Sequence, residues 1–267
     1  MSADPDILPP EHGAGVINDA WQDWRRHTSA RIALGRAGHA QPTSATLAFS
    51  LAHAQARDAI HTPLDAARLQ AELEADGWAV QRVHSQVENR HQYLLRPDLG
   101  RRLHEADAVK LRALASKTVD ISLTIGDGLS STAVQRHALP LLHELREQLG
   151  GELTLGPLVL AEQARVALAD VVGEALRARI AVILLGERPG LSSPDSLGIY
   201  LTHSPRVGRH DAERNCISNV RPEGLGYKAA AFKLAWLLRQ SLHRGLSGVA
   251  LKDESDLALP SVTGALE

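Results

Sequence analysis

The apolar run Ile180–Leu185 is the stretch that most constrains the fold of this chain. It is short, unbroken and rich in β-branched residues, which is typical of a parallel strand that is buried on both faces. The run stops at Gly186, and the pair Pro189-Gly190 favours a turn soon afterwards. Ligands of open α/β sheets bind at the carboxyl ends of the strands, so Glu187 is a candidate binding residue.

Strand-like and helix-like segments alternate through the C-terminal half of the chain. Strands are predicted at 119–125, 153–161, 180–185 and 197–202, with a last short one at 249–251. Helices are predicted at 129–149 (interrupted by Pro140), 164–178 and 225–243, and a polar loop at 206–222 holds Cys216. This spacing predicts βαβ units joined in a mostly parallel sheet.

The segment that precedes these strands is predicted to be mainly helical. Its helices are expected at 16–33, 44–60, 64–79 and 101–114, with Asp65 as the N-cap of the third. The first of them is amphipathic, which suits either an ordinary docking helix or a helix that binds a partner or acts in targeting. The expected fold is α/β: a disordered tail (1–15), a helical domain (16–115) and a Rossmann-like domain (116–267).

Composition excludes several classes of protein. The net charge of −2 provides no basic field for nucleic acid, and no apolar run is long enough to span a membrane. Cys216 is the only cysteine, so neither an intramolecular disulfide nor a cysteine zinc cluster can form. The acidic, proline-rich N-terminus does not resemble a signal peptide, and we expect a cytoplasmic protein.

Three carboxylates follow the first three predicted strands: Asp127, Glu162 and Glu187. Ionised carboxylates only accept hydrogen bonds, so this edge suits a ligand with many N–H donors better than a phosphate. Asp127 and Glu162 each precede a predicted helix, so N-capping is an equally good interpretation for these two. It is a weaker interpretation for Glu187, which precedes a turn.

Three further features admit a functional and a structural interpretation. The segment Gly126–Ser131 resembles a dinucleotide fingerprint with serine as its third small residue, which supports an NAD(P)-dependent enzyme as the alternative function. Cys216 suits a nucleophile or, more simply, a small packing group. His53, Arg57 and His61 share one helix face, which suits solvent, a ligand or partner, or least well a metal ion. None of these completes a catalytic constellation.

Longer segments carry a resemblance to a known family. They are ARIALGRAG (30–38), FSLAHAQARDAIHTPLD (49–65), YLLRPDLGRRL (93–103), IGDGLS (125–130), LAEQARVALAD (160–170), LLGERPGLSSPDSLGIYLTHSPRVG (184–208) and ERNCISN (213–219). In these segments the chain closely resembles the small (light) subunits of ethanolamine ammonia-lyase, and the agreement extends over most of residues 30–252.

The resemblance implies a carbon–nitrogen lyase that depends on adenosylcobalamin and converts ethanolamine to acetaldehyde and ammonia. It implies a hetero-oligomer in which the large subunit carries the substrate site and the small subunit, inactive alone, helps to bind cobalamin at the interface. The family's cobalamin contacts fall on Val166, Glu187 and Cys216, and no residue is implied as catalytic or metal-binding. The chain lacks the D-x-H-x-x-G signature, so base-on cobalamin is expected. The resemblance also raises a bacterial microcompartment as the location within the cytoplasm.

Overall fold

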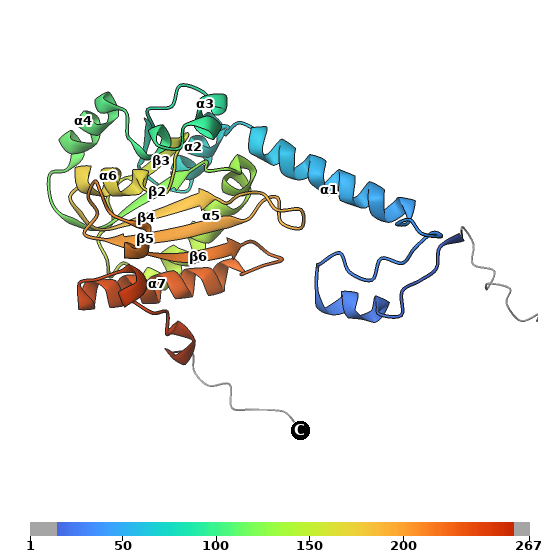
Figure 1. The fold of residues 1–267 in the computed structure, drawn as a ribbon. Helices are drawn as coiled ribbons and strands as arrows, with labels where there is room; N and C mark the ends of the chain where they lie inside the picture. Colours follow the sequence, from blue (N-terminus) through green and yellow to red (C-terminus); the bar gives the residue numbers. More distant parts are fainter. Residues whose placement is uncertain (1–14, 259–267) are drawn as a thin grey trace, which may run out of the picture. The chain divides into compact units, whose positions relative to one another are not determined.

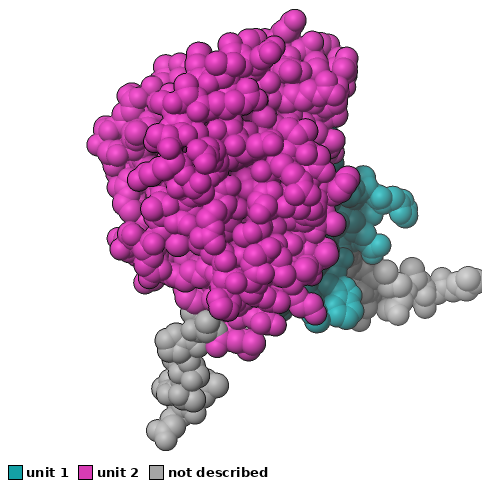
Figure 2. Space-filling model, turned by 90° about the vertical axis from the view of Figure 1, so that its left-hand side faces the viewer, with its two compact units in different colours: residues 1–57, 190–192 teal, residues 58–189, 193–267 magenta. Residues whose placement is uncertain are grey.

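The computed structural model describes residues 15–258, so residues 1–14 of the expected disordered tail lie outside the described part of the chain. The chain divides into two compact units, coloured separately in Figure 2. The first comprises residues 1–57 and 190–192, and the second comprises residues 58–189 and 193–267.

The first unit contains the 3₁₀ helix η2 (Gln22–His27) and most of the helix α1 (Thr43–His61). The α1 prediction is confirmed, whereas the helix predicted over 16–33 is wrong, because only η2 forms there. Local side chains bond the backbone instead: Asp19 Oδ1 accepts from the Trp21 N–H at 2.8 Å, and Thr28 Oγ1 accepts from the Ala30 N–H at 3.1 Å. Such short-range bonds compete with the helical ladder.

The second unit is organised around a six-stranded sheet. Its strands are β1 (Val80–His84), β2 (Val119–Gly126), β3 (Leu158–Glu162), β4 (Ala178–Gly186), β5 (Leu197–His203) and β6 (Arg214–Val220), in the order β1-β3-β2-β4-β5-β6. The first four strands in this order pair in parallel, while β5 and β6 join antiparallel. The expected α/β fold with a mostly parallel sheet is confirmed.

Helices pack on both faces of the parallel part of the sheet. They are α2 (Ala66–Ala75), α3 (Arg90–Leu95), α4 (Glu105–Leu114), α5 (Ser131–Leu149), α6 (Leu168–Ala175) and α7 (Tyr227–Arg244), supplemented by the 3₁₀ helices η3 (Leu99–Arg101), η4 (Asp211–Glu213), η5 (Gly248–Ala250) and η6 (Ser255–Ala258). One core cluster joins the sheet to α2, α5 and α7, and another joins it to α4 and α6. β4 alternates between the two clusters, so it is buried on both faces as predicted.

The fully buried apolar residues of the antiparallel pair β5–β6 belong to one core cluster, while the half-buried Tyr200 packs against the other. Leu197, Ile199 and Leu201 of β5, with Ile217 of β6, all belong to the cluster that contains α5 and α7. In Figure 1, α7 runs beside β6, whereas α4 and α6 lie towards the other edge of the sheet. The opposite face of β5–β6 carries Tyr200 and Cys216, and it is more open than the rest of the sheet.

Several predicted elements differ from the structure. The polar loop predicted over 206–222 contains β6, and the strand predicted at 249–251 is replaced by η5. Pro140 lies inside an uninterrupted α5. β1 belongs to the region expected to be mainly helical and pairs with β3, while the domain boundary near residue 116 stays a prediction. Within residues 15–258, none of the helices combines the length and the apolar character that crossing a membrane requires.

Candidate functional site

Two of the three residues implied by the resemblance line one hollow of the second unit. Val166 lies in the loop between β3 and α6, and Cys216 lies on β6. The hollow has a volume of about 400 Å³, and its remaining lining residues are Pro97, Arg101, Arg165, Ala167, Tyr200, Asp211 and Arg214. The fold therefore brings together two residues that are fifty positions apart in the sequence.

Glu187 lies immediately after β4, half-buried, on the same face of the sheet as the hollow. Its Oε2 atom accepts a hydrogen bond from the Asn219 backbone N–H at 3.1 Å. Its side chain rests over Gly198, where a Cβ atom would approach Glu187 Oε1 and Tyr200 Cε2 to 3.1 Å each. Oε1 accepts no hydrogen bond within the described residues, so Glu187 retains a free acceptor at this edge.

Tyr200 connects Glu187 to the hollow, and the sequence did not single it out. It pairs with Cys216 across β5 and β6, and its hydroxyl interacts with the thiol. Burial raises the pKa of Cys216 and outweighs the Tyr200 hydroxyl, which lowers it, while the Glu187 carboxylate adds a smaller rise. Although Cys216 is exposed, its thiolate is therefore disfavoured, and the sulfur acts as a packing group more readily than as a nucleophile.

A buried carboxylate holds the loop that carries Val166. Asp127 accepts a hydrogen bond from the Ala164 N–H at 2.9 Å, and Arg90 Nη1 lies 3.5 Å from its other oxygen. Burial raises the pKa of Asp127 to about 6, although the Ala164 bond and Arg90 act against this. Asp127 thus performs neither role considered for it, because it bonds the neighbouring loop while Ser130 caps α5.

Tyr93 also holds the loop that carries Val166. Its buried ring lies between two guanidinium groups, with Arg90 Cζ 4.6 Å and Arg165 Cζ 4.2 Å from the ring centroid. Its hydroxyl donates to the Ala164 carbonyl at 2.8 Å, and Arg165 Nη2 donates to the Tyr93 carbonyl at 3.1 Å. Stacking and hydrogen bonding together fix the residues next to Val166.

The third carboxylate of the predicted cluster is also engaged within the protein. Glu162 forms an ion pair with Arg82 at 2.7 Å across β1 and β3. Of the three acidic residues that follow the predicted strands, Glu187 is the one that lies beside the hollow with an unused oxygen. Of the three carboxylates predicted to bind a donor-rich ligand, Glu187 is therefore the one that we retain as a candidate.

The segment that resembles a dinucleotide fingerprint is packed against the end of β4. Gly128 has φ +59°, and a Cβ atom there would lie 2.2 Å from the Gly186 carbonyl oxygen. The Leu129 N–H donates to that same oxygen at 2.9 Å, and Arg90 Nη1 donates to the Gly128 carbonyl at 2.7 Å. To bind a pyrophosphate, a turn needs free backbone N–H groups and room for the phosphates to approach its backbone. In this turn the Leu129 N–H is already bonded, and Gly128 is packed against Gly186.

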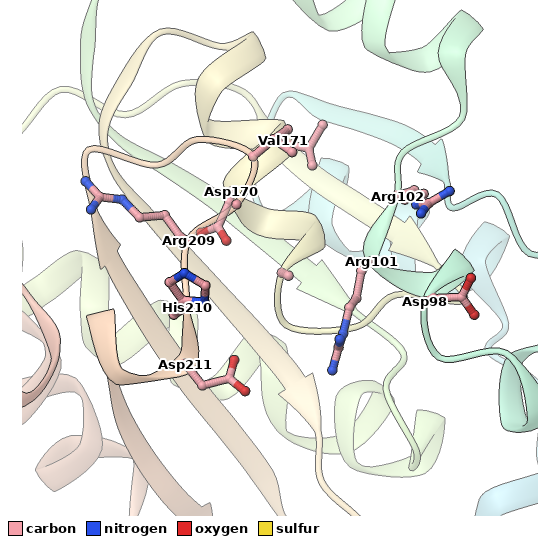
Figure 3. Close-up of a pocket in the computed structure, with 11 residues that line it drawn as sticks. Asp98, Arg101, Arg102, Asp170, Val171, Arg209, His210 and Asp211 are labelled. Atoms are coloured by element: carbon pink, nitrogen blue, oxygen red, sulfur yellow. The ribbon is translucent and has the colours of Figure 1, made fainter.

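A second hollow of about 370 Å³ adjoins the first and shares Arg101, Ala167 and Asp211 with it. Figure 3 shows that the Arg101 side chain extends towards the side of the second hollow on which Asp211 lies. The Arg209 side chain points away from Asp211. Asp170 of α6, which lines the second hollow, forms an ion pair with Arg214 of β6, which lines the first. Burial raises the pKa of Asp170 despite this partner.

The remaining candidates are the polar residues on one face of α1. His53, Arg57 and His61 are all exposed on α1, which agrees with a solvated face. Within residues 15–258, no group of three or more histidine, cysteine, aspartate or glutamate side chains is arranged to hold a metal ion.

Comparison with known proteins identifies the family. The sequence model of the ethanolamine ammonia-lyase light chain (EutC) matches residues 18–252. The chain belongs to this family.

Similar proteins, each named ethanolamine ammonia-lyase small subunit, occur in several bacteria. The relative from Ralstonia nicotianae is 56% identical over 250 residues, which cover 92% of this chain and 93% of the relative. The relative from Azotobacter vinelandii is 57% identical over 247 residues, 91% of this chain and 92% of the relative. A third relative, from Pseudomonas fluorescens, is 52% identical over 244 residues, which cover 90% of this chain and 88% of the relative. As a light-chain family member, the protein thus aligns over nearly its whole described length.

Proposed function

We propose that this chain is the small subunit of an adenosylcobalamin-dependent ethanolamine ammonia-lyase and helps to bind the cofactor where it meets the large subunit. In this proposal Val166 and Cys216 pack against the corrin ring, and Glu187 accepts a hydrogen bond from one of its peripheral amides. The observation that carries the proposal is the convergence of these three residues, from three separate segments, on the open face of β5–β6.

The polar and apolar side chains on this face of the sheet fit a corrin ring. Peripheral amides are N–H donors, and Glu187 Oε1 is an acceptor with no partner within residues 15–258. Val166 and Cys216 are small and weakly polar, and the raised pKa of Cys216 keeps its sulfur neutral at pH 7. Arg101 and Arg165 border the same hollow and suit the carbonyl oxygens of the amides.

When bound, the cofactor supplies the radical chemistry, and this chain supplies binding and orientation. The loop held by Asp127 and Tyr93 fixes the position of Val166, while Gly198 gives Glu187 room to lie against the sheet. With no catalytic constellation of its own, the chain alone should not turn over ethanolamine. Base-on cobalamin, the hetero-oligomer, and a cytoplasmic or microcompartment location remain part of the proposal. No feature of the structure favours the NAD(P)-dependent alternative.

The proposal is tested by replacing Glu187 in the assembled enzyme. Glu187→Gln keeps the side-chain shape and an acceptor for the Asn219 N–H, but it removes the charge. Losing a charged acceptor should weaken adenosylcobalamin binding about tenfold, and the apo chain should keep its melting temperature. Glu174→Gln is a matched control, because Glu174 Oε2 accepts a backbone N–H from Val207 in the same way. Equal affinity of the Glu187 variant and wild type would reject the ligand role.

The single cysteine offers an independent readout. Alkylation of Cys216 by iodoacetamide should be slow at pH 7 and accelerate above it, since the thiolate is disfavoured. In a complex with the large subunit, adding adenosylcobalamin should slow the reaction further if Cys216 lies under the corrin. An alkylation rate that does not respond to the cofactor would contradict this placement.

A further inference from the structure

The first unit exposes several large apolar side chains. The exposed fractions are 65% for Trp21, 56% for Trp24, 45% for Ile17 and 40% for Ile32. Leu47, Phe49 and Leu51 of α1, in the same unit, are exposed by 64%, 46% and 60%. Isolated exposed apolar residues are common on protein surfaces, but a group of this kind marks a surface that another molecule covers.

Three of these side chains form one concave surface, which we call the tryptophan hollow. The Trp21 and Trp24 rings lie with their centroids 6.1 Å apart. Together with Ile32, Asp19 and Ala33 they line a hollow of about 440 Å³. Tryptophan side chains in such pockets contribute the largest share of binding energy in many protein interfaces.

The segment that carries the tryptophan hollow has a defined backbone. Ile17 and Arg36 exchange two backbone hydrogen bonds, of 2.7 and 2.9 Å, which close the segment on itself. Gly35 has φ +78°, and a Cβ atom there would lie 2.6 Å from the Ile17 carbonyl oxygen, so only glycine fits. Arg31 Nη2 donates to the Leu191 carbonyl at 3.2 Å, within the same unit. The tryptophans are therefore presented by a folded loop.

The charges around the tryptophan hollow specify the chemistry of its partner. Between residues 15 and 36 the chain has four arginines and two aspartates, a net charge of +2 in a protein whose total is −2. Arg25 and Arg26 are exposed on η2 next to Trp24, while Asp19 is the one charged residue among those that line the hollow itself. A complementary surface would be apolar at its centre and acidic at its rim.

We infer that the tryptophan hollow docks onto an apolar, acidic-rimmed surface of the large subunit and serves as an anchor in addition to the cofactor face. This rests on the proposed function, because it assigns a second contact within the same assembly. The light-chain family match begins at residue 18, so the segment with both tryptophans lies within the part of the chain that the family model covers. A segment within the family match fits the large partner that light chains have in common better than a partner peculiar to one organism.

The inference is tested by measuring the affinity of the full-length chain for the purified large subunit. Trp21→Ala and Trp24→Ala should each weaken association at least about tenfold, as expected for aromatic anchors in a pocket. Trp21→Phe and Trp24→Phe should retain much of the affinity. Val249→Ala and Leu257→Ala are matched controls, because these side chains are 80% and 85% exposed outside this unit. Raising salt should weaken the wild-type complex, since Arg25 and Arg26 are exposed next to Trp24 on η2.

The outcomes separate this inference from the proposed function. If wild type does not bind the large subunit, the proposed function fails; if wild type and the alanine variants bind equally, only the docking role of the hollow is overturned. An equal loss in the control variants would also overturn it. Circular dichroism of each variant establishes that it is folded, and hydrogen exchange should show residues 15–36 protected in the wild-type complex. A chain that dimerises alone through Trp21 and Trp24 would assign the hollow to a second copy and refute the inference.

Discussion

The side chain of Glu187 lies against Gly198, where a Cβ atom would come within 3.1 Å of both Cγ and Oε1 of the glutamate. The same added atom would meet Tyr200 Cε2 at 3.1 Å. Gly198 thus provides the space in which a carboxylate and an aromatic ring lie side by side on an open strand face. Neither neighbour is backbone, so an added methyl group would displace the two side chains and leave the strand in place.

Gly198→Ala should therefore weaken adenosylcobalamin binding by roughly threefold to tenfold, because a charged hydrogen bond is distorted rather than removed. The melting temperature of the apo chain should stay within a degree or two, since alanine is at least as favourable as glycine in a strand. The comparison is Gly156→Ala, whose added atom would find ordinary contacts of 3.5–3.8 Å. If both variants bind the cofactor like wild type, Gly198 has no part in positioning Glu187.

Asp170→Ala should cost about 3–5 kcal/mol in the free energy of unfolding, because it removes the buried carboxylate that pairs with the Arg214 guanidinium and leaves only the exposed Asp211, 3.4 Å away. Urea denaturation of the apo chain measures this directly. Glu72→Ala, which breaks the exposed Arg68–Glu72 pair, should have little effect and serves as the comparison. A small loss for Asp170→Ala would mean that Arg214 finds another partner or water.

The buried Asp127 should leave a signature in the pH dependence of stability. Its pKa is raised from 3.8 to about 6 on folding, so the native state binds the proton more tightly than the unfolded state. This contribution is present at low pH and is lost as the pH rises from about 4 to about 6, by about 3 kcal/mol at most.

Comparison with Asp127→Asn isolates that signature. The difference in unfolding free energy between variant and wild type should change across this window and be constant above and below it. Other carboxyls, such as Asp195 and Asp107, have lowered pKa values and cancel in the difference. A difference that does not vary with pH would show that Asp127 titrates normally.

NADH should show no saturable binding to the chain. The Leu129 N–H already donates to the Gly186 carbonyl, and Gly128 lies too close to it for a pyrophosphate to enter. Fluorescence titration up to about millimolar concentration, where binding free energies fall to about −4 kcal/mol, is the measurement. Saturation at micromolar NADH would revive the dinucleotide-binding alternative.

Local signals predicted many elements correctly. The β-branched run of β4 and the Asp65 cap, which accepts from the Arg68 N–H at 3.1 Å, are both as expected from the sequence. Pro140 was expected to interrupt its helix, yet α5 continues from Ser131 to Leu149 because its apolar face is held in the core. Here tertiary packing outweighs the local preference.

β6 was missed for a specific reason. Its inward residues Ile217 and Val220 are three positions apart, whereas their partners Ile199 and Leu197 on β5 are two apart. An irregularity of this kind inserts an extra residue and breaks the alternation that identifies a strand. The open outer face adds polar residues at the other positions, so the segment has the composition of a loop.

The residues of the candidate site were named through the resemblance, and their arrangement came from the fold. Nothing local in the sequence marks Tyr200 as the neighbour of Cys216, because their contact depends on the antiparallel register of β5 and β6. The alternation of 197–203 does place Tyr200 opposite to Ile199 and Leu201, and that signal would have assigned it to the outer face. The engagement of Asp127 and Glu162 depends on Ala164 and Arg82, contacts that only the assembled sheet creates.

The position of Tyr93 between Arg90 and Arg165 has a consequence for genetics. Tyr93 is fully buried, yet it supports the loop that carries Val166 through its ring and its hydroxyl. Under the proposed function, a screen for loss of the assembled enzyme's activity would therefore recover alleles at codon 93, and extra cobalamin would suppress the milder ones. Such alleles would alter a residue that is buried in the protein and does not itself line the hollow.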